Sequence, residues 1–288
     1  MTLRGRTRIA DWIETVLLVR GNRPLGIDPL NGYFEARHGL EPQMVSTGIR
    51  EMSRRAGLMG ERYPFDVNEF AVRSLTDAEC TTYVTATLLA PGNAVREYIS
   101  ASPDESMAVI FENLVVGASS RIWGDAGKAL RFGWPSDIGR PPEFDQAIAW
   151  LASKIGVDVG HGYRQPRRKD GGVDVVAWRP FPDGRSGFPV LLVQCTLQEN
   201  LLAKGMDVDT RLWGSWLAMD VDPTIALATP SALAPGTVWD ELALKYMILD
   251  RIRLVGLSEA SVTDEIAKEW VAGTINDLRE KMEEACEL

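Results

Sequence analysis

Two apolar segments in the middle of the chain carry polar residues of the types that bind metal ions. Residues 173–178 contain one carboxylate, Asp174, and residues 190–196 end in polar side chains that include Gln194 and Thr196. Both segments are short and apolar, which predicts two strands, and the Pro, Asp and Gly residues between them predict a hairpin turn. Hard divalent ions such as magnesium prefer oxygen ligands from a few side chains, a carbonyl and water. A carboxylate on one strand beside polar groups at the end of the next is therefore a candidate metal site.

Side chains alternate between the two faces of a strand, and this determines which polar groups of the second strand can act together. Gln194 and Thr196 share one face of a strand, and Cys195 points to the other face. A second interpretation stays open for the same residues, with Asp174 as a charge at a strand edge and Gln194 as a hydrogen-bonded amide of the core.

The residues G-V-D-V-V, a hairpin and then L-L-V-Q-C-T resemble the core of the PD-(D/E)xK nuclease superfamily, which includes many restriction enzymes. In that family a first acid lies on one strand, a pair written (E/D/Q)-x-K lies on the next strand, and a helix follows. The resemblance, carried by residues 141–257, implies that Asp174 is the first acid and that Gln194 fills the Glu or Gln position. Thr196 stands where the family has lysine.

The resemblance also implies roles for residues around this core. Asp174, Gln194 and the carbonyl of Cys195 would hold magnesium, or manganese in its place. Lys204 on the following helix is the candidate for a catalytic lysine that has moved to a neighbouring element, and Asp145 is the candidate for a further acid on the helix before the core strands. The structural alternatives are a carboxylate that suits a helix dipole for Asp145 and a lysine that lies along an apolar surface for Lys204.

A basic stretch lies directly before Asp174. Residues 161–169 have the sequence HGYRQPRRK, the most basic short segment in this half of the chain. Clustered positive charge beside an acidic site could hold a DNA backbone, which makes four residues candidates for DNA binding: Arg164, Arg167, Arg168 and Lys169. The alternative is an ordinary solvated loop.

Composition excludes several classes of function. The 288 residues carry a net charge of -9, which argues against a broadly basic nucleic-acid binder but permits a local basic groove. Three widely spaced cysteines form no disulfide framework or zinc-finger pattern, and two histidines cannot build a histidine-rich metal site. Asp11 and Glu14 interrupt the first apolar run, so a signal peptide is not expected. No stretch reaches transmembrane length, and a cytoplasmic protein with no membrane partner is expected.

Helical periodicity and turn residues predict the organisation of the chain. Residues 7–19 and 45–59 are expected to be helices, and residues 21–42 are expected to be a loop. Arg50, Arg54 and Arg55 are expected on the polar side of the second helix, which faces solvent or, as the alternative, contacts phosphate. Gly and Pro residues near position 140 predict a boundary between a mostly helical N-terminal region, residues 1–140, and an α/β domain, residues 141–288. The second domain is expected to hold a mixed central sheet flanked by helices, similar to a restriction endonuclease. Within it, helical spacing after residue 143 and over residues 200–217 predicts two helices, and residues 224–228 and 247–257 are expected to be strands.

The resemblance implies a magnesium-dependent nuclease that cleaves DNA in restriction or anti-phage defence, with a protein partner from a defence complex as a further expectation. The alternative is a catalytically inactive subunit that keeps the nuclease fold and binds DNA or partner proteins. A third hypothesis is an enzyme that acts on a small molecule with the same sheet, because fold analogy alone does not define a reaction.

Overall fold

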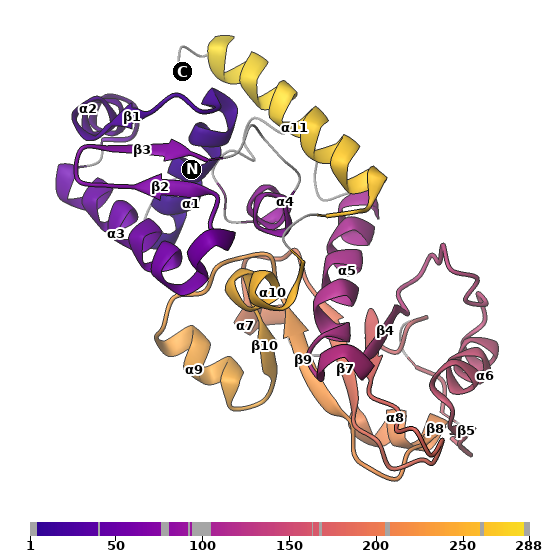
Figure 1. Ribbon diagram of the computed structural model, residues 1–288. Coiled ribbons are helices and arrows are strands. Elements are labelled where there is room, and N and C mark those ends of the chain that lie inside the picture. The colour runs from indigo at the N-terminus through magenta and orange to yellow at the C-terminus, as the bar shows by residue number, and fades with distance from the viewer. Residues whose placement is uncertain are drawn as a thin grey trace. The chain divides into compact units, whose positions relative to one another are not determined.

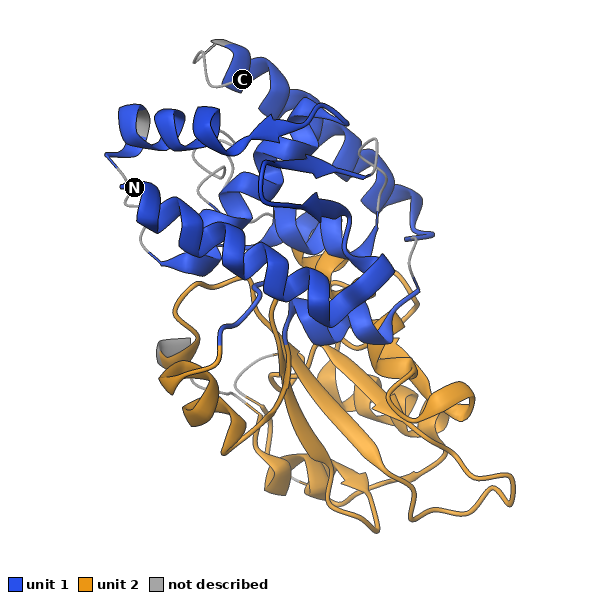
Figure 2. Cartoon of the chain, turned by 60° about the vertical axis from the view of Figure 1, so that its left-hand side comes forward, with its two compact units in different colours: residues 1–107, 230–234, 250–288 blue, residues 108–229, 235–249 orange. Residues whose placement is uncertain are grey.

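The structure, a computed structural model, describes most of the chain as helices and strands (Figure 1). The described residues are 5–39, 41–75, 81–91, 93, 105–162, 164–166, 169–204, 208–259 and 262–284. The chain forms two compact units (Figure 2). Unit 1 consists of residues 1–107, 230–234 and 250–288, and unit 2 consists of residues 108–229 and 235–249.

These units divide the chain differently from the boundary expected at residue 140. The C-terminal helices belong to unit 1 because Val255, Val271 and Leu278 are buried in the same apolar cluster as the first helix. The segment before residue 140 belongs to unit 2 because its strand Lys128–Arg131 pairs with strand Val175–Trp178 of the large sheet. Burial of apolar side chains, and not the local content of Gly and Pro, defines the units.

Unit 1 is mostly helical, with a small antiparallel sheet in the order β1-β3-β2. Its helices are α1 (Arg6–Arg20), α2 (Ile27–His38), α3 (Pro42–Met59), α4 (Thr82–Leu89), α10 (Arg251–Leu257) and α11 (Glu265–Glu284), with a 3-10 turn at Gly60–Arg62. Its strands are β1 (Leu25–Gly26), β2 (Phe65–Val67) and β3 (Ala71–Ser74). The expected helices at residues 7–19 and 45–59 are confirmed with small shifts at their ends.

Helix α2 occupies a segment that was expected to be a loop. Asp28 and Pro29 lie in its first turn, where proline is tolerated because the N–H groups there have no partner within the helix. Gly39 ends the helix in the left-handed conformation, with φ of 60°, and donates its N–H to the carbonyl of Glu35. The Gly and Pro residues therefore mark the ends of a helix and not an irregular segment.

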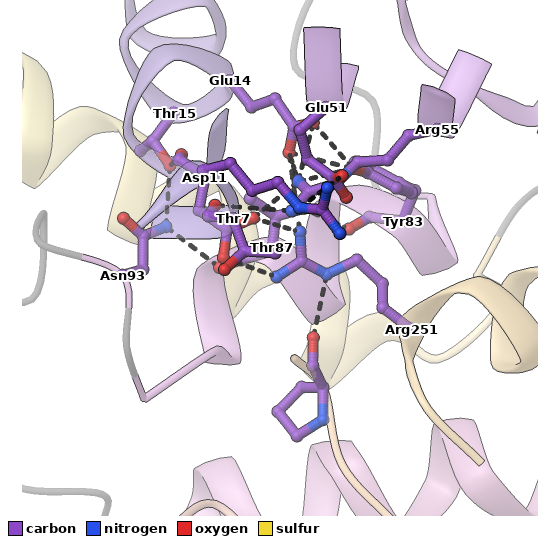
Figure 3. A network of polar contacts seen from close by, with 12 residues as sticks. Thr7, Asp11, Glu14, Thr15, Glu51, Arg55, Tyr83, Thr87, Asn93 and Arg251 are labelled. Carbon is purple, nitrogen blue, oxygen red and sulfur yellow. Dashed lines mark hydrogen bonds and ion pairs between the residues drawn. The ribbon is translucent and has the colours of Figure 1, made fainter. Parts of the chain in front are cut away.

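A buried network of charged groups lies inside unit 1 (Figure 3). Arg55 contacts Asp11 at 2.6 Å and Glu14 at 2.9 Å, and its Nε donates to Glu51 at 3.2 Å. Arg251 donates to Asp11 at 2.8 Å from the other end of the chain. All five of these residues are at most 5% exposed, so the expectation that Arg55 faces solvent is wrong. A buried guanidinium requires carboxylate partners, and the three acids on α1 and α3 supply them.

Burial and the neighbouring arginines shift the pKa values of these acids in opposite directions. Burial alone would raise the pKa of Asp11, yet Arg251 and Arg55 hold that pKa below its ordinary value. Burial raises the pKa of Glu14 in spite of Arg55. Glu14 also accepts hydrogen bonds from the hydroxyls of Tyr63 at 2.7 Å and Tyr83 at 2.8 Å. All members of the network are buried and bind one another, so the network has a structural role in unit 1.

Unit 2 is built on a mixed five-stranded sheet with the order β10-β9-β7-β6-β4. Its strands are β4 (Lys128–Arg131), β6 (Val175–Trp178), β7 (Val190–Cys195), β9 (Thr224–Ala228) and β10 (Met247–Leu249), and β5 (Asp158–Val159) pairs with β8 (Leu217–Ala218). Strands β4, β6 and β7 are antiparallel neighbours, whereas β7, β9 and β10 are parallel. The expected mixed sheet and the hairpin between β6 and β7 are confirmed.

Helices cover this sheet on both faces. They are α5 (Glu105–Ser120, in unit 2 from Ala108), α6 (Phe144–Ile155), α7 (Leu201–Lys204), α8 (Thr210–Trp216) and α9 (Thr237–Ala243), with a 3-10 turn at Gly124–Ala126. On one face, Val176 and Leu192 pack in one apolar cluster with residues of α6 and α8. Arg131 lies on the opposite face from its neighbour Leu130 and forms an ion pair with Glu112 of α5 at 2.8 Å.

Two segments differ from their expected secondary structure. Residues 200–217 were expected as one helix but contain α7 and α8, and Asp209 caps α8 by accepting from the N–H of Arg211. Residues 247–257 were expected as one strand, but Asp250 caps a new helix, α10, by accepting from the N–H of Arg253. A capping acid inside an apolar run therefore decides where a helix begins. None of the described helices combines the length and the apolar character needed to cross a membrane.

Candidate metal site at the start of β6

Asp174 directly precedes β6, and its backbone is fixed on two sides. Its carbonyl oxygen accepts hydrogen bonds from the N–H of Phe132 at 2.7 Å and of Gly133 at 2.9 Å, just after β4. Its own N–H donates to the carbonyl of Val193 on β7 at 2.9 Å. The register pairs Val193 with Val175, so two successive residues face one residue of β7, as at a β-bulge. A bulge changes the direction of a side chain at the end of a strand.

The carboxylate of Asp174 is held against the end of β7. Its Oδ2 accepts from the N–H of Cys195 at 2.6 Å, in the place where a longer β6 would supply a backbone carbonyl. A short hydrogen bond from a backbone N–H to an ionised carboxylate is among the stronger types in proteins. The side chain is half-buried, so the carboxylate is both oriented by the protein and reachable from solvent.

Gln194 directly precedes Cys195 at the end of β7 and has an unusual environment. Its side chain is 1% exposed, yet its Oε1 has no hydrogen-bond partner in the described part of the chain. The interpretation of Gln194 as a hydrogen-bonded amide of the core is therefore wrong for this oxygen. A buried amide oxygen with no partner costs about 1–3 kcal/mol, and such groups often mark a site where an ion or water binds.

Thr196, at the position of the family's lysine, has a local structural role. It is 3% exposed, its N–H donates to the carbonyl of Ala228 on β9, and its hydroxyl accepts from the N–H of Gln198 at 3.1 Å. The hydroxyl thus stabilises the turn that follows β7.

Glu112 lies close to the backbone of the candidate site, and sequence reasoning did not single it out. A Cβ added to Gly133 would meet the Oε2 of Glu112 at 2.6 Å, so this carboxylate lies against the same short segment that hydrogen bonds to Asp174. Burial raises the pKa of Glu112 even though Arg131 contacts it, and the charge of Asp170 raises it further. Glu112 and Arg131 are 19 residues apart in the chain, and no local pattern connects them.

The structure describes the other expected site residues to different extents. Asp145 is exposed in the first turn of α6 and accepts from Gln165 Nε2 at 2.8 Å, and no hydrogen bond or ion pair between described residues connects it with Asp174. Lys204 is the last residue of α7, but its side chain lies outside the part of the chain that is described. Of the expected DNA-binding residues, Arg164 and Lys169 are exposed, and the placement of Arg167 and Arg168 lies outside the described residues.

The residues at the start of β6 fit a hard divalent cation by their chemistry. Among the described residues, no three His, Cys, Asp or Glu side chains form a metal-binding group. Hard cations also accept amide and backbone carbonyl oxygens, which such a group omits. Two observations support a cation here: the Oε1 of Gln194 has no partner among the described residues, and the carboxylate of Asp174 is oriented by the N–H of the next residue along β7, Cys195.

Replacing Gln194 with leucine separates a functional amide from a structural one. We expect Gln194→Leu to keep or raise the free energy of unfolding, because the deleted oxygen has no partner whose bond would be broken. The same change is expected to weaken binding of Mn²⁺. Urea denaturation and a Mn²⁺ titration measure the two effects, and Gln198→Leu, at an exposed position close by, is the control. A Gln194→Leu protein that is much less stable than the control would identify Gln194 as a core residue.

Comparisons with known proteins give no identification. No model of a protein family, no curated protein and no solved structure matches this chain.

Proposed function

We propose that unit 2 is a magnesium-dependent nuclease that cleaves DNA phosphodiester bonds, with a role in restriction or anti-phage defence, and that it belongs to the PD-(D/E)xK superfamily with a restriction-endonuclease-like fold. The carrying observation is the carboxylate of Asp174, oriented by the N–H of Cys195, together with the buried and unpartnered Oε1 of the preceding residue, Gln194. The order of the elements supports the proposal. An acid begins β6, the adjacent strand β7 ends in Gln194, and the helix α7 follows.

In this proposal Asp174, Gln194 and the carbonyl of Cys195 hold the ion, with manganese as a substitute. A bound magnesium ion polarises phosphate and lowers the pKa of an attacking water. Lys204 is assigned to stabilise the charge that develops on the phosphate, in place of the lysine that Thr196 replaces. Glu112 fits the position of the further acid better than Asp145, because α5 precedes the first strand of the sheet, whereas α6 lies between β4 and β6.

The second candidate is a subunit that keeps this fold and binds DNA or a partner protein without cutting. The observation in its favour is Thr196, whose buried hydroxyl is engaged with the N–H of Gln198 and carries no charge. A hydroxyl can orient water, but it cannot neutralise charge on a phosphate.

Incubation of the full chain with labelled DNA separates the two candidates. The nuclease proposal predicts cleavage of single- or double-stranded substrate in Mg²⁺ and none in excess chelator, with slower cleavage by Lys204→Ala. Cleavage that is equally fast in Lys204→Ala would refute the assignment of the lysine alone. DNA binding without any cleavage under these conditions would favour the inactive subunit.

The basic segment before Asp174 is expected to contact phosphate. Replacing Arg167, Arg168 and Lys169 together with alanine should weaken DNA binding and reduce the slope of log affinity against log salt by about 0.7–0.9 for each phosphate that the protein no longer neutralises. Fluorescence anisotropy at several salt concentrations measures this slope. The Arg185→Ala protein is the control, because Arg185 is an exposed cation in the hairpin between β6 and β7. A slope equal to that of the wild type would exclude the basic segment from the interface.

A further inference from the structure

An exposed tryptophan lies next to the candidate metal site. Trp134 follows Gly133, whose N–H donates to the carbonyl of Asp174 at 2.9 Å, and 37% of its surface is accessible to solvent. Large aromatic side chains usually bury most of their surface. Trp134 is thus one residue away from a backbone contact of Asp174, and more than a third of its surface is open to solvent.

Two cations surround the Trp134 ring. The guanidinium carbon of Arg140 is 5.5 Å from the Trp134 ring centroid and 4.4 Å from that of Phe132, and the Lys169 Nζ is 5.6 Å from the Trp134 centroid. These distances are within the range of cation–π attraction. The exposed Trp134 ring and the exposed Lys169, with the buried guanidinium of Arg140 beside the ring, form a group that we call the Trp134 platform.

Arg140 is charged and buried, and it forms no direct ion pair among the described residues, although the charge of Asp170 acts on it from further away. It is 3% exposed, its Nη atoms donate only to the carbonyls of Pro141 and Lys169, and its Nε has no partner in the described part of the chain. Burial lowers the pKa of Arg140, because removing a charged guanidinium from water costs free energy. An anion that approaches the Trp134 platform would compensate this cost.

Several hydrogen bonds and an ion pair hold the segment that carries Trp134. Arg131 donates to Asp137 at 2.9 Å and to the carbonyl of Pro135. The hydroxyl of Ser136 accepts from the N–H of Ile138 at 3.2 Å and of Arg140 at 3.1 Å. A segment fixed at this many points presents its aromatic ring without a large loss of conformational entropy on binding.

We propose that the Trp134 platform stacks on an unpaired base of single-stranded DNA and holds the neighbouring phosphate near Asp174. This inference rests on the proposed function and adds the class of substrate. Every base has a π-face that stacks on an aromatic ring, and the phosphates carry the negative charge that Arg140 and Lys169 attract. Bases in an intact duplex are already stacked on one another, so the Trp134 platform selects single strands, overhangs or opened ends.

Binding measured in excess chelator tests the Trp134 platform independently of cleavage. The probe is a labelled oligothymidine, compared with a strand of the same length whose central residue is abasic and with a blunt duplex. Removing one stacked base or its aromatic partner weakens binding by about 5- to 100-fold. We expect this loss for Trp134→Ala with oligothymidine and for the wild type with the abasic strand. Trp134→Ala with the abasic strand should show little further loss, because both changes remove the same contact.

Two variants control for damage to the fold. Trp134→Phe keeps an aromatic face and should retain most of the affinity. Phe181→Ala removes another exposed aromatic, 42% exposed with Arg179 at 5.7 Å, from the hairpin at the opposite end of β6, and should bind as the wild type does. Equal binding by wild type and Trp134→Ala, an equal loss in Phe181→Ala, or no single-strand binding by the wild type would overturn the proposal. Selective binding of single strands by a protein that never cleaves them would leave the platform intact and refute the nuclease activity alone.

Discussion

The Asp174→Ala protein is expected to lose magnesium-dependent cleavage while it keeps its fold. Loss of one preorganised electrostatic group at a reaction centre typically costs about 10²–10³ in rate, and a metal ligand should cost at least as much. The carboxylate of Asp174 also accepts from the N–H of Cys195, so alanine leaves that donor without its partner. Initial rates on labelled DNA, with circular dichroism as the check on folding, measure the effect.

Asp174→Asn is the sharper companion variant. Its amide oxygen can still accept from the N–H of Cys195, but the negative charge that attracts a cation is gone. We expect Asp174→Asn to be as stable as the wild type and as inactive as Asp174→Ala. Asp183→Ala, which removes an exposed carboxylate from the hairpin, should cleave normally. Wild-type rates in Asp174→Asn would remove Asp174 from the catalytic site.

Arg251→Met is expected to lower the free energy of unfolding by about 3–5 kcal/mol, the cost of removing one partner from a buried ion pair. Arg251 is fully buried and donates to Asp11 at 2.8 Å and to the carbonyl of Pro230 at 2.8 Å. Methionine fills much of the same volume, so the loss reports mainly on the buried carboxylates of Asp11 and Glu14, which keep only Arg55 as their cation among the described residues. Urea denaturation followed by circular dichroism measures the difference.

Arg253→Met is the matched control, since Arg253 is exposed on the same helix, and it should change stability by less than about 0.5 kcal/mol. A double variant, Asp11→Asn with Arg251→Met, should lose less than the sum of the two single losses, because each single change leaves a buried charge without one of its partners. Additive losses, or an Arg251→Met protein as stable as the control, would contradict a coupled network.

Local patterns predicted those parts of the fold that local forces determine. Residues 224–228 form the expected strand with the same bounds, β9. The apolar segments on either side of the hairpin form β6 and β7, and the helical spacing after residue 143 forms α6. In these segments the periodicity of apolar side chains agrees with the faces that the sheet and its helices bury.

Contacts between residues far apart in the chain could not be predicted from local sequence patterns. Asp11 and Glu14 could be recognised as charges inside an apolar run, but their partner Arg251 is 240 residues from Asp11. Arg55 has the spacing of a surface residue and becomes buried because acids of α1 face it. Unit 1 could not be outlined from composition for the same reason, because it joins both ends of the chain.

The candidate site was predicted in part. The sequence pattern predicted a site of Asp174, Gln194 and Cys195. The structure places the Asp174 carboxylate on the N–H of Cys195 at the ends of adjacent strands, and the sharing of an ion with Gln194 stays a prediction. Glu112 was missed because nothing in α5 distinguishes it from any half-buried acid until Gly133 is seen to lie against it. Trp134 was missed because its Gly- and Pro-rich surroundings are typical of a linker, whereas Arg131 and Ser136 hold the segment in place.

The proposed function depends most on a divalent cation at the start of β6, and a titration with Mn²⁺ tests this directly. Electron paramagnetic resonance of the free ion counts the sites in the full chain without reference to any substrate. We predict one site in the wild type that is abolished in Asp174→Asn, weakened in Gln194→Leu and unchanged in Asp183→Ala. A wild-type chain that binds no Mn²⁺, or an Asp174→Asn protein that binds it as tightly as the wild type, would contradict the metal site and the nuclease mechanism that requires it.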